Sequence, residues 1–134
     1  MIATKPMHDQ ATANERLSPR ATAYVIVATR ALRDQLLPGM RFADPAWDIL
    51  LDVFVATTRG QVLSISDVGL ASRLPHTTAL RWVEYLIAKR ALRNVQDQND
   101  KRRRLICLTP DYLARFELLM VNVSAAIVAA NDTP

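Results

Sequence analysis

The sequence of 134 residues is poor in the residues that build disulfide-bonded, metal-binding or catalytic sites. Its one cysteine, Cys107, cannot form an internal disulfide, and its two histidines are His8 and His76. It contains no metal-ligand spacing, phosphate-binding loop or nucleophile motif. These absences argue against an enzyme, and we expect no catalytic residue, no metal ligand and no cofactor.

Long apolar runs and glycine are also scarce. No run of about 18 or more uncharged apolar residues is present to span a bilayer, and the N-terminus lacks the apolar core of a signal peptide. We therefore expect a cytoplasmic protein with no membrane partner. Three glycines favour a helical fold over a β-sandwich or barrel. The length predicts one domain, near the size at which a small unit gains stability from a partner.

Apolar helices are predicted near both ends of the chain. The pairs Ser18-Pro19 and Thr109-Pro110 are helix start signals, and they predict helices over residues 18–39 and 109–131. Both segments are apolar on more than one side, which a helix on the surface of a monomer would not need. We therefore expect these two segments to be dimerisation helices of a homodimer.

The segments beside them are less apolar. Residues 1–17 are polar and irregular, and they predict a flexible N-terminal arm outside a single domain over 18–134. Asp44-Pro45 repeats the start signal and predicts a scaffold helix that ends near Gly60. Residues 61–63 predict a short strand that pairs with a hairpin further along the chain.

The segment over 64–109 is read as a helix-turn-helix followed by a hairpin. Ser64 and Asp67 resemble a capping box, which places the start of the first helix near Ser64. Gly69 suits a helix that crosses another helix closely, because glycine inside a helix otherwise costs roughly 0.5–1 kcal/mol relative to alanine. The turn carries Leu74-Pro75, and the second helix is predicted over 76–89.

The second helix is amphipathic. Its apolar face repeats at three- and four-residue intervals and predicts burial of Ala79, Trp82, Val83, Leu86 and Ile87. The opposite face carries Thr77, Thr78 and Arg81, and its first turn is rich in hydrogen-bond donors. Such a face beside a basic hairpin is typical of a helix that enters a DNA groove. An ordinary helical hairpin with solvated charges is the alternative from the helices alone.

The hairpin that follows favours the DNA-binding interpretation over the ordinary helical hairpin. Strand-like runs over 92–96 and 102–108 flank the turn formers of 97–101, and Lys101, Arg102, Arg103 and Arg104 stand consecutively. Neighbouring side chains of a strand point to opposite faces, so this run indicates a projecting wing with both faces exposed. The segment from Arg73 to Arg104 carries a net charge of +6 in a chain of net charge +4, which places the predicted polyanion-binding surface here.

The order of helix, turn, helix and basic wing resembles the MarR (multiple antibiotic resistance regulator) family over about a third of the chain. Asp100-Lys101-Arg102 at the wing tip and Leu108-Thr109 before the next helix carry the resemblance. It implies a mainly α protein with a small β wing, a winged helix-turn-helix with N- and C-terminal dimerisation helices. It also implies a transcriptional regulator that binds pseudo-palindromic double-stranded DNA as a homodimer. The recognition helix then enters the major groove, and Arg102 of the wing reaches the minor groove.

The expected DNA-binding residues are His76, Thr77, Thr78, Arg81, Lys101, Arg102 and Arg103, with Asp100 orienting the wing. Members of the family often bind small aromatic acids or other ligands, so a small-molecule effector is a candidate partner, with Tyr24, Trp47 and Trp82 as candidate lining residues and core packing as their alternative role. The sequence departs from the family at Pro75, where a side-chain cap is usual, and at Ala91 and Tyr112, where glycine is usual. A winged-helix protein-interaction module without sequence-specific DNA binding is the alternative function.

Overall fold

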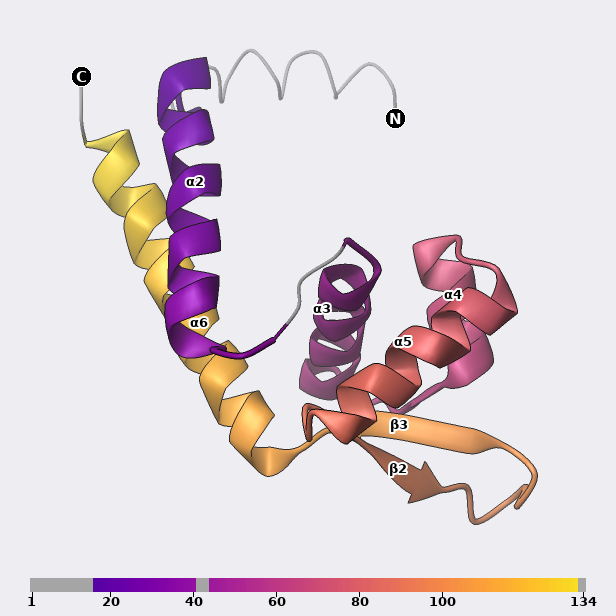
Figure 1. Ribbon diagram of the computed structural model, residues 1–134. Helices are drawn as coiled ribbons and strands as arrows, with labels where there is room; N and C mark the ends of the chain where they lie inside the picture. Colours follow the sequence, from indigo (N-terminus) through magenta and orange to yellow (C-terminus); the bar gives the residue numbers. More distant parts are fainter. Residues whose placement is uncertain (1–15, 41–43, 133–134) are drawn as a thin grey trace, which may run out of the picture. The chain divides into compact units, whose positions relative to one another are not determined.

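The structure, a computed structural model, describes residues 16–40 and 44–132. Contacts divide these residues into two compact units (Figure 1). One unit contains the described residues up to Pro38 together with those from Leu118 onward, and the other runs from Gly39 to Glu117. The predicted N-terminal arm over 1–17 lies outside the described residues apart from its last two positions.

The first unit is built from helix α2 (Pro19–Leu36) and the C-terminal part of helix α6 (Pro110–Asn131). These two segments lie side by side (Figure 1). α2 begins as the sequence predicts, because the Ser18 Oγ accepts a hydrogen bond of 3.1 Å from the Ala21 N–H and proline stands in the first turn. Ahead of α6, the Thr109 Oγ1 accepts a hydrogen bond of 3.3 Å from the Tyr112 N–H.

The second unit is a winged helix-turn-helix. In chain order it contains α3 (Asp44–Thr58), β1 (Leu63–Ser64), α4 (Ile65–Ser72), α5 (His76–Ala88), β2 (Leu92–Gln96), β3 (Arg104–Leu108) and the start of α6. The three strands form an antiparallel sheet in the order β1-β3-β2. The fold class is therefore mainly α with a small β wing, as the sequence predicts. The strand expected at 61–63 is observed at Leu63–Ser64, beginning two residues later, and it pairs with β3 as expected.

The core of this unit is formed where α3, α5, the sheet and the start of α6 meet. The Phe116 ring packs between two half-buried aromatic rings of α3, with centroid distances of 5.7 Å to Trp47 and 5.5 Å to Phe54. Side chains of α3, α4, α5, β2 and β3 are also fully buried: Ile49, Leu50, Val53, Val68, Val83, Leu86, Leu92 and Ile106. Burial of this set fixes α5 by its apolar face and leaves the opposite face to solvent.

Local capping explains the boundaries of the helix-turn-helix. The Ser64 Oγ accepts a hydrogen bond of 3.1 Å from the Asp67 N–H, and the Asp67 Oδ2 accepts one of 3.0 Å from the Ser64 N–H. This is the predicted capping box, and it starts α4. α4 ends at Ser72 and is capped by Arg73, whose φ of 56° is left-handed. Pro75 then precedes α5 without a side-chain capping hydrogen bond, consistent with its departure from the usual capping residue.

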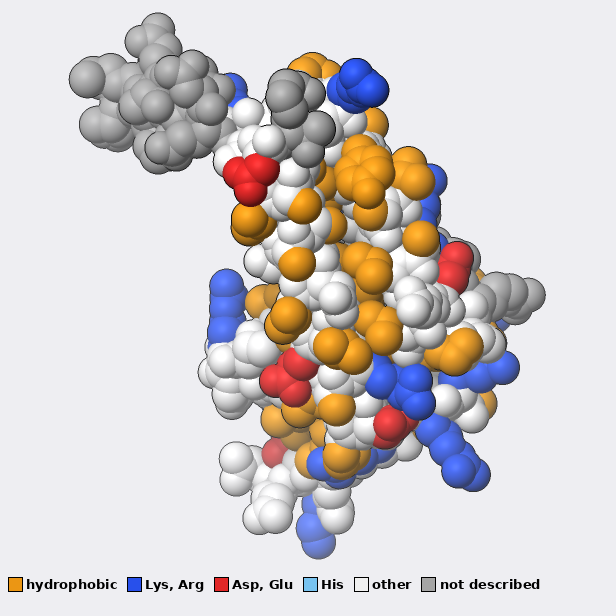
Figure 2. Space-filling model, turned by 90° about the vertical axis from the view of Figure 1, so that its left-hand side faces the viewer, with side chains coloured by type: hydrophobic (Ala, Val, Ile, Leu, Met, Phe, Trp, Pro, Cys, Tyr) orange, Lys and Arg blue, Asp and Glu red, His pale blue; other side chains and the backbone are white. Residues whose placement is uncertain are grey.

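Large hydrophobic side chains are exposed on the first unit. Figure 2 shows hydrophobic side chains gathered along the face of the molecule on which α6 lies. Those of α2 and α6 that are more than two-fifths exposed are Tyr24, Ile26, Val27, Leu118, Val121, Ile127 and Val128. α6 is also long and apolar enough to cross a membrane by length and composition, a test that the core helix of a soluble protein passes equally. In this fold its C-terminal part lies against α2.

Candidate nucleic-acid interface

The exposed face of α5 carries the expected recognition residues. His76, Thr77 and Arg81 are exposed, and Thr78 is half-buried beside the buried Ala79. Within residues 16–40 and 44–132, no acidic group pairs with Arg81, so its guanidinium is available to a ligand. A free arginine one turn into an exposed helix can donate two parallel hydrogen bonds to an acceptor pair such as the edge of guanine.

The tip of the wing is a turn organised by two carboxylates. The Asp97 Oδ1 accepts hydrogen bonds from the N–H groups of Asn99 (2.8 Å) and Asp100 (3.2 Å). The Asp100 Oδ1 accepts one of 3.0 Å from the Arg102 N–H. These bonds hold residues 97–103 out of the sheet. The expectation of a strand from residue 102 is therefore wrong by two residues, because β3 begins at Arg104.

The basic run consequently sends its side chains in different directions. The Arg102 side chain is 93% exposed, and its Nε lies 3.4 Å from the Asp100 Oδ1, the geometry expected of a carboxylate that orients the wing arginine. Lys101 is exposed beside it. Lys101 and Arg102 are therefore the two cations of the run that face solvent and are not held against a helix.

Arg103 and Arg104 are engaged with acids. The Arg103 guanidinium lies 3.7 Å from the Asp67 Oδ2 of α4 and 3.6 Å from the Asp97 Oδ2 of the wing turn. The Arg104 Nη2 lies 2.7 Å from the Glu84 Oε1 of α5 and 2.8 Å from the Asn94 Oδ1 of β2. The structure thus brings Arg103, an expected DNA contact, into internal ion pairs.

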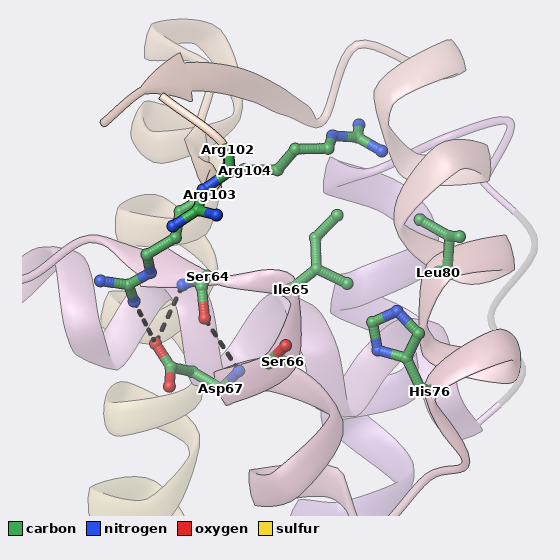
Figure 3. Close-up of a pocket in the computed structure, with 9 residues that line it drawn as sticks. All are labelled: Ser64, Ile65, Ser66, Asp67, His76, Leu80, Arg102, Arg103 and Arg104. Atoms are coloured by element: carbon green, nitrogen blue, oxygen red, sulfur yellow. Dashed lines mark hydrogen bonds and ion pairs between the residues drawn. The ribbon is translucent and has the colours of Figure 1, made fainter. Parts of the chain in front are cut away.

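A hollow of about 470 Å³ lies between the wing and the first turns of α4 and α5. Figure 3 shows Arg103 beside Asp67 on one side of it, His76 and Leu80 of α5 on the other, and Ile65 of α4 between them. Arg104 reaches across to Glu84 of α5. The remaining lining residues are Ser64, Ser66 and Arg102. The hollow is open and predominantly cationic on its wing side, so it suits an anionic surface better than an apolar ligand.

Asp67 is the acid at the edge of this hollow. Hydrogen bonds from the Ser64 backbone and side chain lower the pKa of its carboxyl below the ordinary value of 3.8, and the Arg103 guanidinium adds to the lowering. Asp67 is therefore ionised at neutral pH, and it both caps α4 and holds an arginine of the wing.

The arrangement offers hydrogen-bond donors and positive charge. Across residues 16–40 and 44–132, no three His, Cys, Asp or Glu side chains are grouped so that they could hold a metal ion. Four polar residues of the site were missed as partners of the wing arginines: Asp67, Glu84, Asn94 and Asp97. The Asp97 turn follows a pattern common in tight turns, whereas nothing in the sequence pairs Glu84 with an arginine 20 residues later.

No protein-family model matches this sequence, and no curated protein matches it either.

Solved structures match its fold. S. aureus MepR in complex with DNA is 17% identical, with a TM-score of 0.63 over 80% of this chain and 84% of that one. Bordetella bronchiseptica BpsR, whose DNA binding is regulated by 6-hydroxynicotinic acid, is 24% identical, with a TM-score of 0.51 over 82% and 75%. The transcriptional regulator Tm0710 of Thermotoga maritima is 14% identical, with a TM-score of 0.62 over 82% and 75%. The chain therefore has the fold of MarR-type winged helix-turn-helix regulators.

Proposed function

We propose that the protein is a DNA-binding transcriptional regulator of the MarR type. It binds a pseudo-palindromic duplex site as a cytoplasmic homodimer, with α5 in the major groove and the wing in the minor groove. The observation that carries this proposal is the exposed Arg81, which pairs with no acid among the described residues, on a helix beside a wing whose Arg102 side chain is 93% exposed. The fold likeness to a regulator solved on DNA supports it.

The two elements would read DNA differently. His76, Thr77, Thr78 and Arg81 supply donors along one edge of α5, which suits base edges and phosphates in the major groove. Lys101 and Arg102 project from the wing, where an arginine in the minor groove responds to groove width and negative potential more than to base identity. Asp100 limits the directions in which Arg102 can point.

The exposed apolar residues of α2 and α6 support the proposed homodimer. Contiguous apolar surface of this kind marks an interaction site on a protein in water. A second copy of the same chain covers it in a two-fold arrangement, and a two-fold dimer presents two recognition helices to a pseudo-palindromic site. Small aromatic acids are the effector class to screen first, because DNA binding by the similarly folded BpsR is regulated by one.

Selection of duplexes from a random library by the full chain tests the proposal. We expect enrichment of one sequence with two similar half-sites about one helical turn apart. Failure to retain any duplex, even at low salt, would contradict the regulator and favour the protein-interaction module. Immunoprecipitation of the tagged protein with genomic DNA then identifies the sites in cells.

A further inference from the structure

The basic run of the wing divides into two pairs with different surroundings. Lys101 and Arg102 are exposed, and the one acid beside Arg102 belongs to the same turn. Arg103 and Arg104 each contact an acid on a helix of the helix-turn-helix, the first on α4 and the second on α5. We infer that Arg103 and Arg104 are positioning residues that fix the wing against these two helices. This inference rests on the proposed function.

The Arg103 bridge joins two segments that are each ordered independently. On α4, Asp67 is held by the capping box with Ser64. In the wing, Asp97 is only 8% exposed and holds the turn through two backbone N–H groups. Arg103 contacts the Oδ2 atoms of both carboxylates, at 3.7 and 3.6 Å. The N-terminus of α4 and the base of the wing turn are therefore connected through one guanidinium.

The Arg104 bridge joins both wing strands to the recognition helix. Arg104 pairs with Gln96 across the sheet, so Asn94 is its diagonal neighbour on the same face of β2. The Arg104 Nη2 contacts the Asn94 Oδ1 at 2.8 Å and the Glu84 Oε1 at 2.7 Å. Glu84 stands on the exposed side of α5. These contacts fix the position of the wing relative to α5, the helix that also carries Arg81.

The surroundings of these arginines favour positioning over direct contact with DNA. Both charges are already opposed by carboxylates, and a phosphate would have to compete with them. Their ion pairs are partly exposed, with Arg103 51% and Arg104 42% exposed, so their contribution to overall stability is small. Their expected effect is on specificity, because Arg81 and Arg102 must reach neighbouring grooves at the same time.

Glu84→Ala separates this inference from simple electrostatics. Removal of an acid from a DNA-facing surface should tighten binding to every duplex if charge alone matters. If Glu84 positions the wing through Arg104, affinity for the selected duplex falls about tenfold relative to a scrambled duplex, the loss expected for one misplaced base contact. Asp48→Ala, an exposed acid of α3, is the charge-matched control and should leave this ratio unchanged. An unchanged ratio for Glu84→Ala would overturn the inference.

The dependence of binding on salt provides a second readout. Arg102→Gln should lower the slope of log affinity against log salt by about one, because a phosphate or groove contact is lost. Arg104→Gln should leave the slope unchanged and lower the specificity ratio. A drop of about one in the slope for Arg104→Gln, with specificity retained, would assign Arg104 to a phosphate and overturn the inference.

Charge reversal tests the pairing itself. Glu84→Arg and Arg104→Glu should each reduce specificity, and the double variant should recover most of it, since it restores an ion pair at the same two positions. Equal thermal unfolding of all variants excludes loss of fold as the cause. If the loss of specificity in the double variant equals the product of the two single losses, the pair has no positioning role. Failure of the unmodified chain to select any duplex would overturn the proposed function, and this inference with it.

Discussion

Gly69 of α4 faces Ala79 of α5 at a distance that leaves room for one methyl group. A Cβ added at Gly69 would lie 3.6 Å from the Ala79 Cβ and 3.7 Å from the Leu74 carbonyl oxygen, which are ordinary contact distances. The sequence predicts a very small residue at this helix crossing, and alanine is small enough as well as glycine. We predict that Gly69→Ala raises the free energy of unfolding by about 0.5–1 kcal/mol, because glycine loses more backbone entropy on folding.

Urea denaturation of the full chain measures this change. Gly69→Leu is the matched variant, and it should lower the free energy of unfolding by about 1–3 kcal/mol, because a branched side chain does not fit this contact. Destabilisation by alanine as well would show that the two helices approach more closely than these distances indicate.

The local features of the fold could be predicted from the sequence. The capping box at Ser64 and the proline start signals act within one turn of helix, so the boundaries of α2, α4 and α6 follow from neighbouring residues. The apolar repeat of α5 likewise predicts which side is buried. The three-stranded sheet followed from alternation and turn residues. β2 begins where the sequence predicts, whereas β1 and β3 each begin two residues later than expected.

The partners of the wing arginines could not be predicted in this way. Arg104 contacts Glu84, 20 residues earlier, and Arg103 contacts Asp67 on a different element. Such pairs depend on how the elements pack, and four consecutive cations look equivalent in a sequence. The turn at Asp97 gives each side chain its own direction, and this made Arg103 an internal partner in place of a free cation.

Arg90 adopts a backbone conformation that favours glycine. Its φ is 61°, and it closes the C-terminus of α5 through hydrogen bonds of 2.9 Å from the Arg90 N–H to the Ile87 carbonyl and from the Ala91 N–H to the Leu86 carbonyl. The resemblance to the family places the usual glycine one residue later, at Ala91. We predict that Arg90→Gly stabilises the protein by about 1 kcal/mol, because a left-handed conformation costs L-residues that much.

Lys89→Gly is the control for this prediction. Lys89 has a φ of −81°, where glycine has no advantage, so its replacement should leave stability unchanged or lower it. Thermal and urea unfolding of both variants at low and high salt separate the backbone effect from the loss of one positive charge. Destabilisation by Arg90→Gly would contradict the strain argument.

Asp67 should make the stability of the protein depend on acid pH. Its pKa is lowered in the folded state, chiefly by the Ser64 backbone hydrogen bond, so its contribution is present above the ordinary value of 3.8 and is lost as the pH falls through the lower folded value. We predict that Asp67→Ala costs about 1 kcal/mol at neutral pH, the usual effect of losing a capping interaction. The difference from the unmodified chain should shrink below about pH 4.

Urea denaturation of both proteins from about pH 7 to about pH 3 measures this profile. Asp48→Ala, which removes an exposed carboxylate of α3, is the charge-matched control. A difference for Asp67→Ala that persists undiminished at the lowest pH would mean that the charge of Asp67 contributes nothing to folding.

Val121 of α6 is 64% exposed and belongs to the apolar face assigned to the homodimer. We predict that Val121→Asp weakens dimerisation about 100-fold or more, because a two-fold interface contains the substitution twice and each unpaired charge costs on the order of 2 kcal/mol or more. Sedimentation at several protein concentrations measures the equilibrium. Val55→Asp, at a valine of α3 that is 45% exposed, is the matched control and should remain dimeric. Equal association of both variants would place the interface elsewhere.

The last prediction separates the contributions of Arg81 and Arg102 to DNA binding. Arg81→Ala should cost roughly 1–3 kcal/mol on the selected duplex and relax base preference at one position, because a bidentate contact to a base edge is lost. Arg102→Ala should weaken binding to selected and scrambled duplexes together and lower the salt slope by about one. Titrations at several salt concentrations measure both effects. Arg30→Ala, an exposed arginine of α2, should change neither. If neither Arg81→Ala nor Arg102→Ala changes DNA binding, the proposed regulator function is wrong, and the protein-interaction module is the better account.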